Sequence, residues 1–142
     1  MECRRACWFY NPAPPWIQVH PNYTMVNVEA ERSDPNSVFH YYRRLISLRK
    51  KHPIVVYGSY ELVPTDGEQL FVYRRKLKRQ RLVVILNVSD RPAVYHWSED
   101  WSMAEGRLLI SNYPPLEGYG SGGAAKEMKL RPYEARVYGY GL

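Results

Sequence analysis

The chain has 142 residues, which suits one ordinary domain. Hydrophobic residues make up 45% and charged residues 24% of it, a balance typical of a folded globular protein and not of a disordered one. The longest uninterrupted apolar run, residues 82–86, is too short to span a bilayer, so we expect no membrane partner.

The net charge of +6 indicates a solvated basic surface. One run of basic residues is the candidate for a polyanion site. In residues 74–81, six of the eight residues are Lys or Arg. A nucleic-acid site would also need interleaved aromatic residues or a known binding module, and neither accompanies this run. Because the run lies between two apolar segments, we interpret it as a charged hairpin tip and expect no nucleic-acid partner.

Cys3 and Cys7 are the only two cysteines. Their spacing, without a nearby histidine or a second cysteine pair, fits neither a zinc site nor a disulfide framework. We therefore expect no metal and no cofactor. The first residues, Met1–Arg5, are not followed by the apolar stretch of a secretory signal, so a reducing cytoplasmic setting is the simplest expectation.

In chain order, residues 1–33 are predicted to be irregular because prolines interrupt them repeatedly. The pattern then predicts one amphipathic helix over residues 34–52, with Asp34 as its N-cap and Pro35 at its first position. Pro53 is expected to end it. We accordingly divide the chain into an arm and helix, residues 1–52, and a second part, residues 53–142.

Seven short strands are predicted in the second part: 59–63, 70–74, 82–88, 93–97, 107–112, 127–130 and 135–140. Residues 82–88 are nearly all apolar and are expected to form a central strand. The glycine-rich residues 118–123 are interpreted as a loop, since no strand-to-helix transition or GK[ST] motif marks a phosphate site. The fold class is thus mainly β: a Greek-key-like antiparallel β-sandwich, preceded by one amphipathic helix and a proline-rich irregular arm.

One aromatic group is a weak candidate for binding a neutral ligand. His96 and Trp97, with Trp101 nearby, could form a patch on which a sugar ring stacks. Packing of the strand inside the sandwich is the favoured alternative. The four histidines are scattered, and they support neither a Ser–His–acid arrangement nor an HExxH metal motif.

Several segments resemble the oligo-1,6-glucosidase and α-glucosidase group of the α-amylase-like glycoside hydrolases. The resemblance starts at about Pro15 and lies in PWIQVHPNY, VNVEAE, DPNSVFHYYRRLISLRKKHP, VVYGSY, LVVILNVS and LRPYEARVY. His20 replaces the Asn that is usual in the first of these motifs. Residues 1–14 do not resemble the family's preceding stretch.

This resemblance implies the last helix of a catalytic (β/α)₈ barrel, residues 34–52, followed by the C-terminal β-domain. The family's catalytic acids lie in barrel segments that match no position here, so no catalytic residue is carried over. Adjacent Glu99 and Asp100 would point to opposite faces of a strand and cannot easily flank one glycosidic bond. We therefore expect an inactive, non-catalytic piece that stabilises the barrel.

The expected partner is the catalytic barrel, which is absent from this chain. Without it, the apolar face of helix 34–52 should either pack back onto the β-domain or drive self-association. The alternative is a stand-alone carbohydrate-binding or interaction module that binds oligosaccharides weakly through Trp97 and Trp101. The parent substrate stays open among isomaltose, maltose, sucrose and trehalose 6-phosphate.

Overall fold

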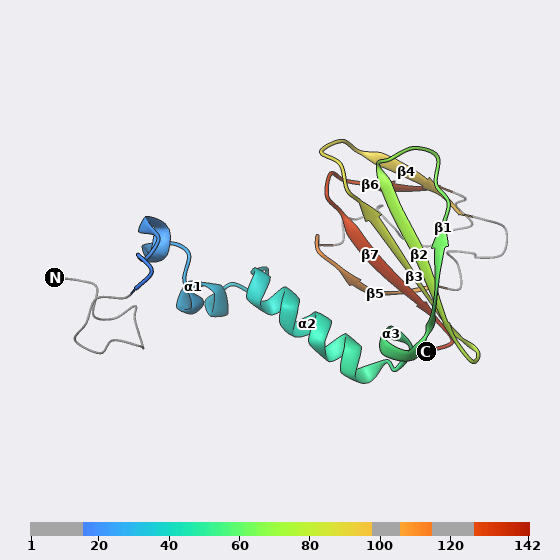
Figure 1. The fold of residues 1–142 in the computed structure, drawn as a ribbon, viewed down its shortest axis with the longest axis horizontal. Coiled ribbons are helices and arrows are strands. Elements are labelled where there is room, and N and C mark those ends of the chain that lie inside the picture. The colour runs from blue at the N-terminus through green and yellow to red at the C-terminus, as the bar shows by residue number, and fades with distance from the viewer. Residues whose placement is uncertain (1–15, 98–105, 115–126) are drawn as a thin grey trace. The chain divides into compact units, whose positions relative to one another are not determined.

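The computed structural model describes residues 16–97, 106–114 and 127–142 (Figure 1). The chain divides into two compact units, Met1–Arg43 and Arg44–Leu142. None of the described helices is long and apolar enough to cross a membrane.

The first unit contains two short helices, η1 (Pro21–Thr24) and α1 (Val28–Ser33). The expectation that residues 1–33 are irregular throughout is therefore wrong for these segments. Asn27 begins α1, because its side-chain oxygen accepts a 2.9 Å hydrogen bond from the Ala30 amide.

The amphipathic helix exists, but it begins later than predicted. α2 spans Val38–Lys51, and Ser37 rather than Asp34 stands at its start. The Ser37 carbonyl accepts from the Tyr41 amide at 3.0 Å, and its hydroxyl oxygen accepts from the His40 amide at 3.4 Å. Asp34 instead accepts from the Asn36 amide at 2.8 Å, which forms a turn between α1 and α2.

A short helix that the sequence did not predict, α3 (Ile54–Tyr57), follows Pro53. Ile54 is fully buried against Leu82 and Val84. The Arg75 guanidinium donates hydrogen bonds to the carbonyls of Val55 and Gly58, which holds the end of α3 on the neighbouring strand.

The strands form two antiparallel sheets, and their predicted positions are confirmed to within a few residues. The strands are β1 (Ser59–Val63), β2 (Leu70–Leu77), β3 (Gln80–Asn87), β4 (Ala93–His96), β5 (Arg107–Ser111), β6 (Glu127–Leu130) and β7 (Ala135–Tyr140). Sheet A has the order β1-β2-β3-β7-β5, with β3 central as expected, and sheet B pairs β4 with β6. The basic run forms the β2–β3 hairpin, whose tip is Lys78 and Arg79.

One buried core cluster joins the two sheets, which lie one over the other in Figure 1. Sheet A contributes Val72, Val83, Ile85 and Tyr138, and Tyr95, Met128 and Leu130 come from sheet B. The side of sheet A that carries this cluster is called its inner face below, and the side that α3 contacts is its outer face. The prediction of a mainly β, antiparallel fold is confirmed.

The contact between α3 and sheet A gives a direct stability prediction. Ile54→Ala should lower the free energy of unfolding by about 2–5 kcal/mol, because it leaves a cavity beside Leu82. Val56→Ala on the same helix is the control and should cost well under about 1 kcal/mol, since Val56 is 39% exposed. Urea denaturation of both variants measures the difference, and equal losses would contradict the packing of α3.

Candidate functional site

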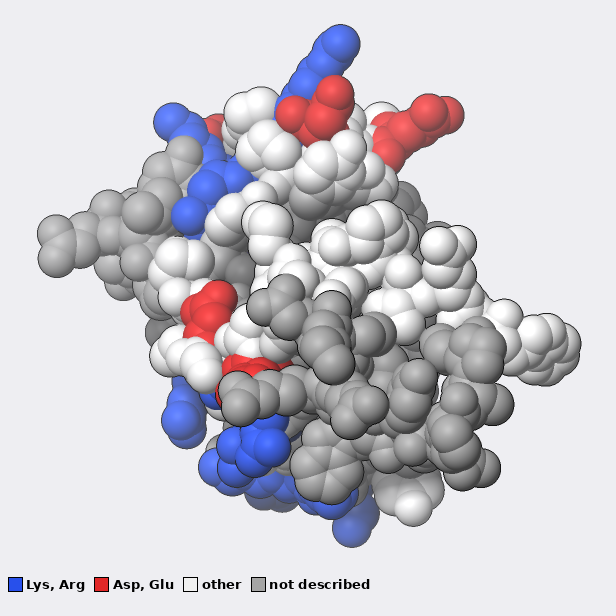
Figure 2. Space-filling model, turned by 90° about the vertical axis from the view of Figure 1, so that its left-hand side faces the viewer, with Lys and Arg blue, Asp and Glu red and all other residues white. Residues whose placement is uncertain are grey.

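Among the described residues, Glu134 is the one acid that is buried. Its side chain is 1% exposed and lies in the turn that leads from β6 of sheet B to β7 of sheet A. On the face drawn in Figure 2, Lys and Arg side chains gather along the lower edge, whereas Asp and Glu side chains occupy separate places. A buried carboxyl is a candidate for catalytic chemistry, because burial can shift its pKa.

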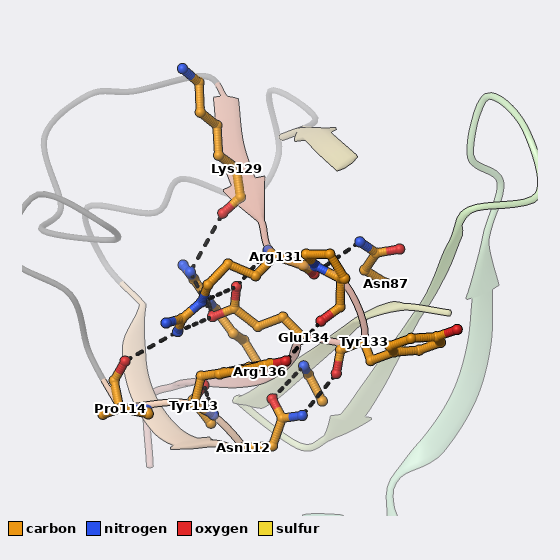
Figure 3. Close-up of polar contacts among 12 residues, drawn as sticks. Asn87, Asn112, Tyr113, Pro114, Lys129, Arg131, Tyr133, Glu134 and Arg136 are labelled. Atoms are coloured by element: carbon orange, nitrogen blue, oxygen red, sulfur yellow. Dashed lines mark hydrogen bonds and ion pairs between the residues drawn. The ribbon is translucent and has the colours of Figure 1, made fainter. Parts of the chain in front are cut away.

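Arg131 and Arg136 donate hydrogen bonds to the two oxygens of the Glu134 carboxylate (Figure 3). The Arg131 backbone amide and Nε donate to Oε2 at 2.8 and 3.3 Å, and one of its terminal nitrogens donates to Oε1 at 3.1 Å. Arg136, itself 4% exposed, donates its Nε to Oε1 at 2.9 Å. The carboxylate is therefore saturated with charged donors.

The electrostatics of this cluster keep Glu134 ionised. Burial by itself would raise the pKa of the carboxyl, but hydrogen bonds from the Arg131 side chain and backbone and from Arg136 outweigh it and hold the pKa below its ordinary value. A general acid of a glycosidase needs a raised pKa and a second carboxyl across a cleft. Glu134 has neither among the described residues, so its arrangement supports a structural ion cluster.

Further contacts attach the Arg131 side chain to the end of β5. Its guanidinium carbon lies 4.2 Å from the centre of the Tyr113 ring, and a terminal nitrogen donates to the Pro114 carbonyl at 3.1 Å. The Tyr113 hydroxyl donates to the Pro132 carbonyl at 3.1 Å. The turn between the sheets is thus bound to a strand end that is distant in sequence.

Two asparagines fix the backbone of the same turn from opposite sides. Buried Asn87, at the end of β3, donates from Nδ2 to the carbonyls of Arg91 and Arg131 at 2.6 and 2.9 Å. Asn112, beyond β5, donates to the Tyr133 carbonyl and accepts from the Ala135 amide, both at 2.8 Å. The turn therefore has little freedom to change conformation.

This bonding holds Tyr133 in a conformation that tyrosine rarely adopts. Its φ is 54°, in the left-handed region, which costs an L-residue with a bulky side chain about 1–2 kcal/mol. Its amide donates to the Ser89 carbonyl at 3.0 Å. The ring points away from the Glu134 cluster in Figure 3 and is 61% exposed, so within this chain it gains little from burial.

The structure separates two of the predicted sugar-patch residues. Trp97 is 9% exposed and packs edge-on against Tyr95 and Tyr138, at ring-centre distances of 5.3 and 5.7 Å. His96 faces solvent, 3.6 Å from the Glu127 carboxylate. This placement favours the packing interpretation for Trp97.

Other sequence hypotheses fall outside the described residues. Trp101, the adjacent pair Glu99 and Asp100, and the glycine-rich residues 118–123 all lie there. Within the described part of the chain, no group of three or more His, Cys, Asp or Glu side chains could hold a metal ion.

One feature of the sequence does point to the ion cluster. Arg136 alternates with Tyr138 along β7, so it occupies a position that faces the core. An arginine at such a position needs a buried acid, and Glu134 at two residues' distance can supply it on the same side. Arg131 completes the cluster only because the turn folds back on itself.

The cluster predicts how stability depends on pH. Because the pKa of Glu134 is lower in the folded state, its contribution is present above the ordinary value of 4.5 and is lost as the pH falls through the folded value. Glu134→Gln should cost about 3–5 kcal/mol at neutral pH, since it leaves Arg136 buried without a counter-charge. The same variant should lose less stability on acidification than the unmodified chain does.

Denaturant titrations between neutral and acidic pH check this expectation. Glu127→Gln is the matched control, because Glu127 is largely exposed, and it should change stability by less than about 1 kcal/mol. If the two variants behave alike, the Glu134 cluster does not stabilise the fold.

Comparisons with known proteins agree with the resemblance seen in the sequence. The family model for the catalytic domain of alpha amylase matches residues 4–58, so it extends N-terminally beyond Pro15, where we expected the resemblance to begin. The oligo-1,6-glucosidase of Parageobacillus thermoglucosidasius is 45% identical over 91% of this chain and 22% of its own length. The chain thus spans about a fifth of the curated relatives that it matches.

Solved structures give the same result. The trehalose-6-phosphate hydrolase of Bacillus licheniformis superposes with a TM-score of 0.75 at 31% identity, over 88% of this chain and 22% of that one. The trehalulose synthase MutB of Pseudomonas mesoacidophila gives a TM-score of 0.78 at 30% identity, with the same coverage of 88% and 22%. The chain belongs to the α-amylase-like glycoside hydrolases and corresponds to part of an oligo-1,6-glucosidase or a related α-glucosidase-type enzyme.

Proposed function

We propose that this chain acts as the non-catalytic C-terminal part of an α-glucosidase-type enzyme and stabilises its catalytic barrel. The observation that carries the proposal is the state of Glu134: the one buried acid among the described residues is ionised and forms ion pairs with two arginines. The parent enzyme would hydrolyse α-glucosidic bonds of short oligosaccharides. A reducing, cytoplasmic setting belongs to the same proposal.

The division of the chain supports this role. The catalytic-domain model stops matching at residue 58, directly after α3, and the seven strands of the described residues follow that point. The matching segment is thus a short end of a catalytic domain, and most of the chain is a β-domain attached to it.

The apolar stripe of α2 provides a second support. Val38, Tyr42 and Ile46 recur at helical spacing and are 68%, 63% and 51% exposed. A helix that presents such a stripe normally packs against other elements, and in a barrel enzyme these would be the neighbouring helices and strands. Covering one of these side chains is worth about 1.5–3 kcal/mol.

The absence of activity is the first test of this proposal. The purified chain should release no nitrophenol from 4-nitrophenyl α-glucoside above background, because hydrolysis needs two carboxyls across a cleft and we expect no carboxyls of this chain to act as such a pair. The oligo-1,6-glucosidase of Parageobacillus thermoglucosidasius is the positive control. Turnover that disappears when one carboxylate of this chain is replaced by its amide would overturn the proposal.

The oligomeric state is the second test. Without a barrel, the purified chain should self-associate through α2, and light scattering after size exclusion should give more than one copy per particle. Ile46→Lys should shift the particle towards the monomer, because it places a charge in the stripe. Ser47→Lys, next to it but outside the stripe, is the control, and an equal effect of both changes would exclude the α2 face as the contact.

A further inference from the structure

The sequence contains one Asp-Gly dipeptide, Asp66 followed by Gly67, which lies in the loop between β1 and β2 (Figure 1). Both residues are exposed. Within the described part of the chain, neither the Asp66 carboxylate nor the Gly67 amide forms a hydrogen bond or an ion pair. A carboxyl group and the backbone amide that follows it are therefore both accessible at one place.

Hydrogen bonds hold the two ends of this loop. The Thr65 hydroxyl donates to the Leu70 carbonyl at 3.0 Å, and the Gln69 carbonyl accepts from the Val88 amide at 2.8 Å. Residues 66–68 lie between these contacts and are all exposed. The ends of the loop are thus fixed, and the peptide bond between Asp66 and Gly67 lies between them.

The backbone at Gly67 favours the accessibility of its nitrogen. Gly67 has a φ of 93°, which a residue with a side chain rarely adopts. A Cβ atom placed there would meet no heavy atom within 4 Å, so the space around the residue is open. Because glycine has no side chain, the neighbouring carboxyl group can approach the nitrogen without steric hindrance from residue 67 itself.

Attack of the Gly67 nitrogen on Cγ of Asp66 closes a succinimide ring. The nitrogen–Cγ bond forms, the bond between Cγ and the carboxyl hydroxyl breaks, and this hydroxyl leaves as water with the amide proton. Water then opens the ring. Attack of water at Cγ restores aspartate, whereas attack at the backbone carbonyl of residue 66 breaks the bond of that carbonyl to nitrogen and gives isoaspartate. Water is the only co-reactant.

The other described Asp and Asn residues are protected from this reaction. Ring closure needs the amide of the following residue, and a hydrogen bond donated by that amide has to open first. Such a bond, of 2.8–3.3 Å, is present after Asn22, Asn36, Asn87, Asp90 and Asn112. Asp34 precedes Pro35, which has no amide proton. The Asn27 side chain is itself bound, to the Ala30 amide and the Tyr23 carbonyl.

We propose that Asp66 is a site of spontaneous covalent modification, at which the folded chain converts to isoaspartate through a succinimide with Gly67. An exposed carboxyl group, a following glycine and an amide without a protecting hydrogen bond coincide at this one place among the described residues. The inference does not depend on the proposed function, because it concerns only a loop of the β-domain.

The conversion changes the backbone of the loop. In isoaspartate the chain runs through Cβ and Cγ of residue 66, so it gains one atom, and a free carboxylate is left on Cα. Because hydrogen bonds fix both ends of the loop, residues 66–68 have to accommodate the added length. A protein-isoaspartate methyltransferase esterifies the carboxylate on Cα, so this enzyme serves as the probe.

Incubation of the full 142-residue chain at neutral pH over several weeks tests the inference. Methyl transfer from labelled S-adenosylmethionine measures isoaspartate, and peptide mapping by mass spectrometry locates it. We expect isoaspartate at residue 66, preceded by a form of the same peptide that is lighter by one water. Asp66→Glu keeps the charge but would need a larger ring, so it should lose the signal, whereas Asp90→Glu should keep it.

The same incubation in urea separates the effect of the fold from that of the sequence. Isoaspartate at residue 66 should form at a rate within about twofold of that in the folded chain, because the folded loop does not protect the site. Deamidation of Asn87 should instead become about tenfold faster or more, because unfolding frees the Val88 amide.

Two results would overturn the proposal. Isoaspartate at residue 66 in the unfolded chain alone would mean that the folded loop protects the site. Equal accumulation at Asp90 in the folded chain would mean that a hydrogen bond on the following amide gives no protection. Circular dichroism and urea denaturation first establish that Asp66→Glu and Asp90→Glu fold.

Discussion

The burial of one carboxylate between two guanidinium groups organises this β-domain. Glu134 sits where the chain crosses from sheet B to sheet A, and Arg131 and Arg136 bind it from both sides of the crossing. Two buried ions of opposite charge stabilise a fold only when their remaining donors and acceptors are also satisfied. The carbonyls of Pro114 and Lys129 and the ring of Tyr113 meet that requirement here.

The same cluster explains the conformation of the adjacent tyrosine. Because Glu134 is fixed on one side and Asn87 and Asn112 bind the backbone, Tyr133 is held at positive φ with its ring directed outward. The buried charges and the exposed ring are therefore two parts of one turn. This connects the interior of the domain to an exposed position on its surface.

The chemistry of Glu134 also differs from that of a glycosidase acid. A glycosidase acid must exchange its proton near neutral pH, and burial without a counter-charge is a common way to achieve that. Here burial is accompanied by two arginines, which hold the pKa of the carboxyl below its ordinary value. The residue that most resembles a catalytic acid by burial is thus unsuited to acid catalysis by its partners.

Much of the fold could be predicted from the sequence, because strand periodicity and turn residues are local signals. The bounds predicted for residues 59–63, 127–130 and 135–140 agree with β1, β6 and β7. The predicted start of α2 was wrong because Asp34 and Ser37 are both residue types that favour the N-cap position. Hydrogen bonds that the sequence does not show determine which of the two begins the helix. α3 was missed because four residues of Val, Ile and Tyr favour a strand, and the contact of Ile54 with sheet A outweighs that preference.

The ion cluster could not be predicted in full, because it depends on contacts between residues distant in sequence. Asn87 lies far from Arg131 along the chain, and only the pairing of β3 with β7 brings them together. The outer face of sheet A has the same origin, because strand register places residues of separate strands, such as Tyr73 and Val84, on one side. The family itself was accessible from the sequence, since its motifs are continuous segments.

Hydroxyl-radical footprinting tests most directly the claim that this chain stabilises a catalytic barrel. The chain is oxidised with and without the oligo-1,6-glucosidase of Parageobacillus thermoglucosidasius produced without the segment that this chain matches. We expect the oxidation of Tyr42 on α2 to slow when this barrel is added, whereas the oxidation of exposed His96 on sheet B should not change. Unchanged oxidation of Tyr42 in a mixture that demonstrably forms a complex would contradict the claim.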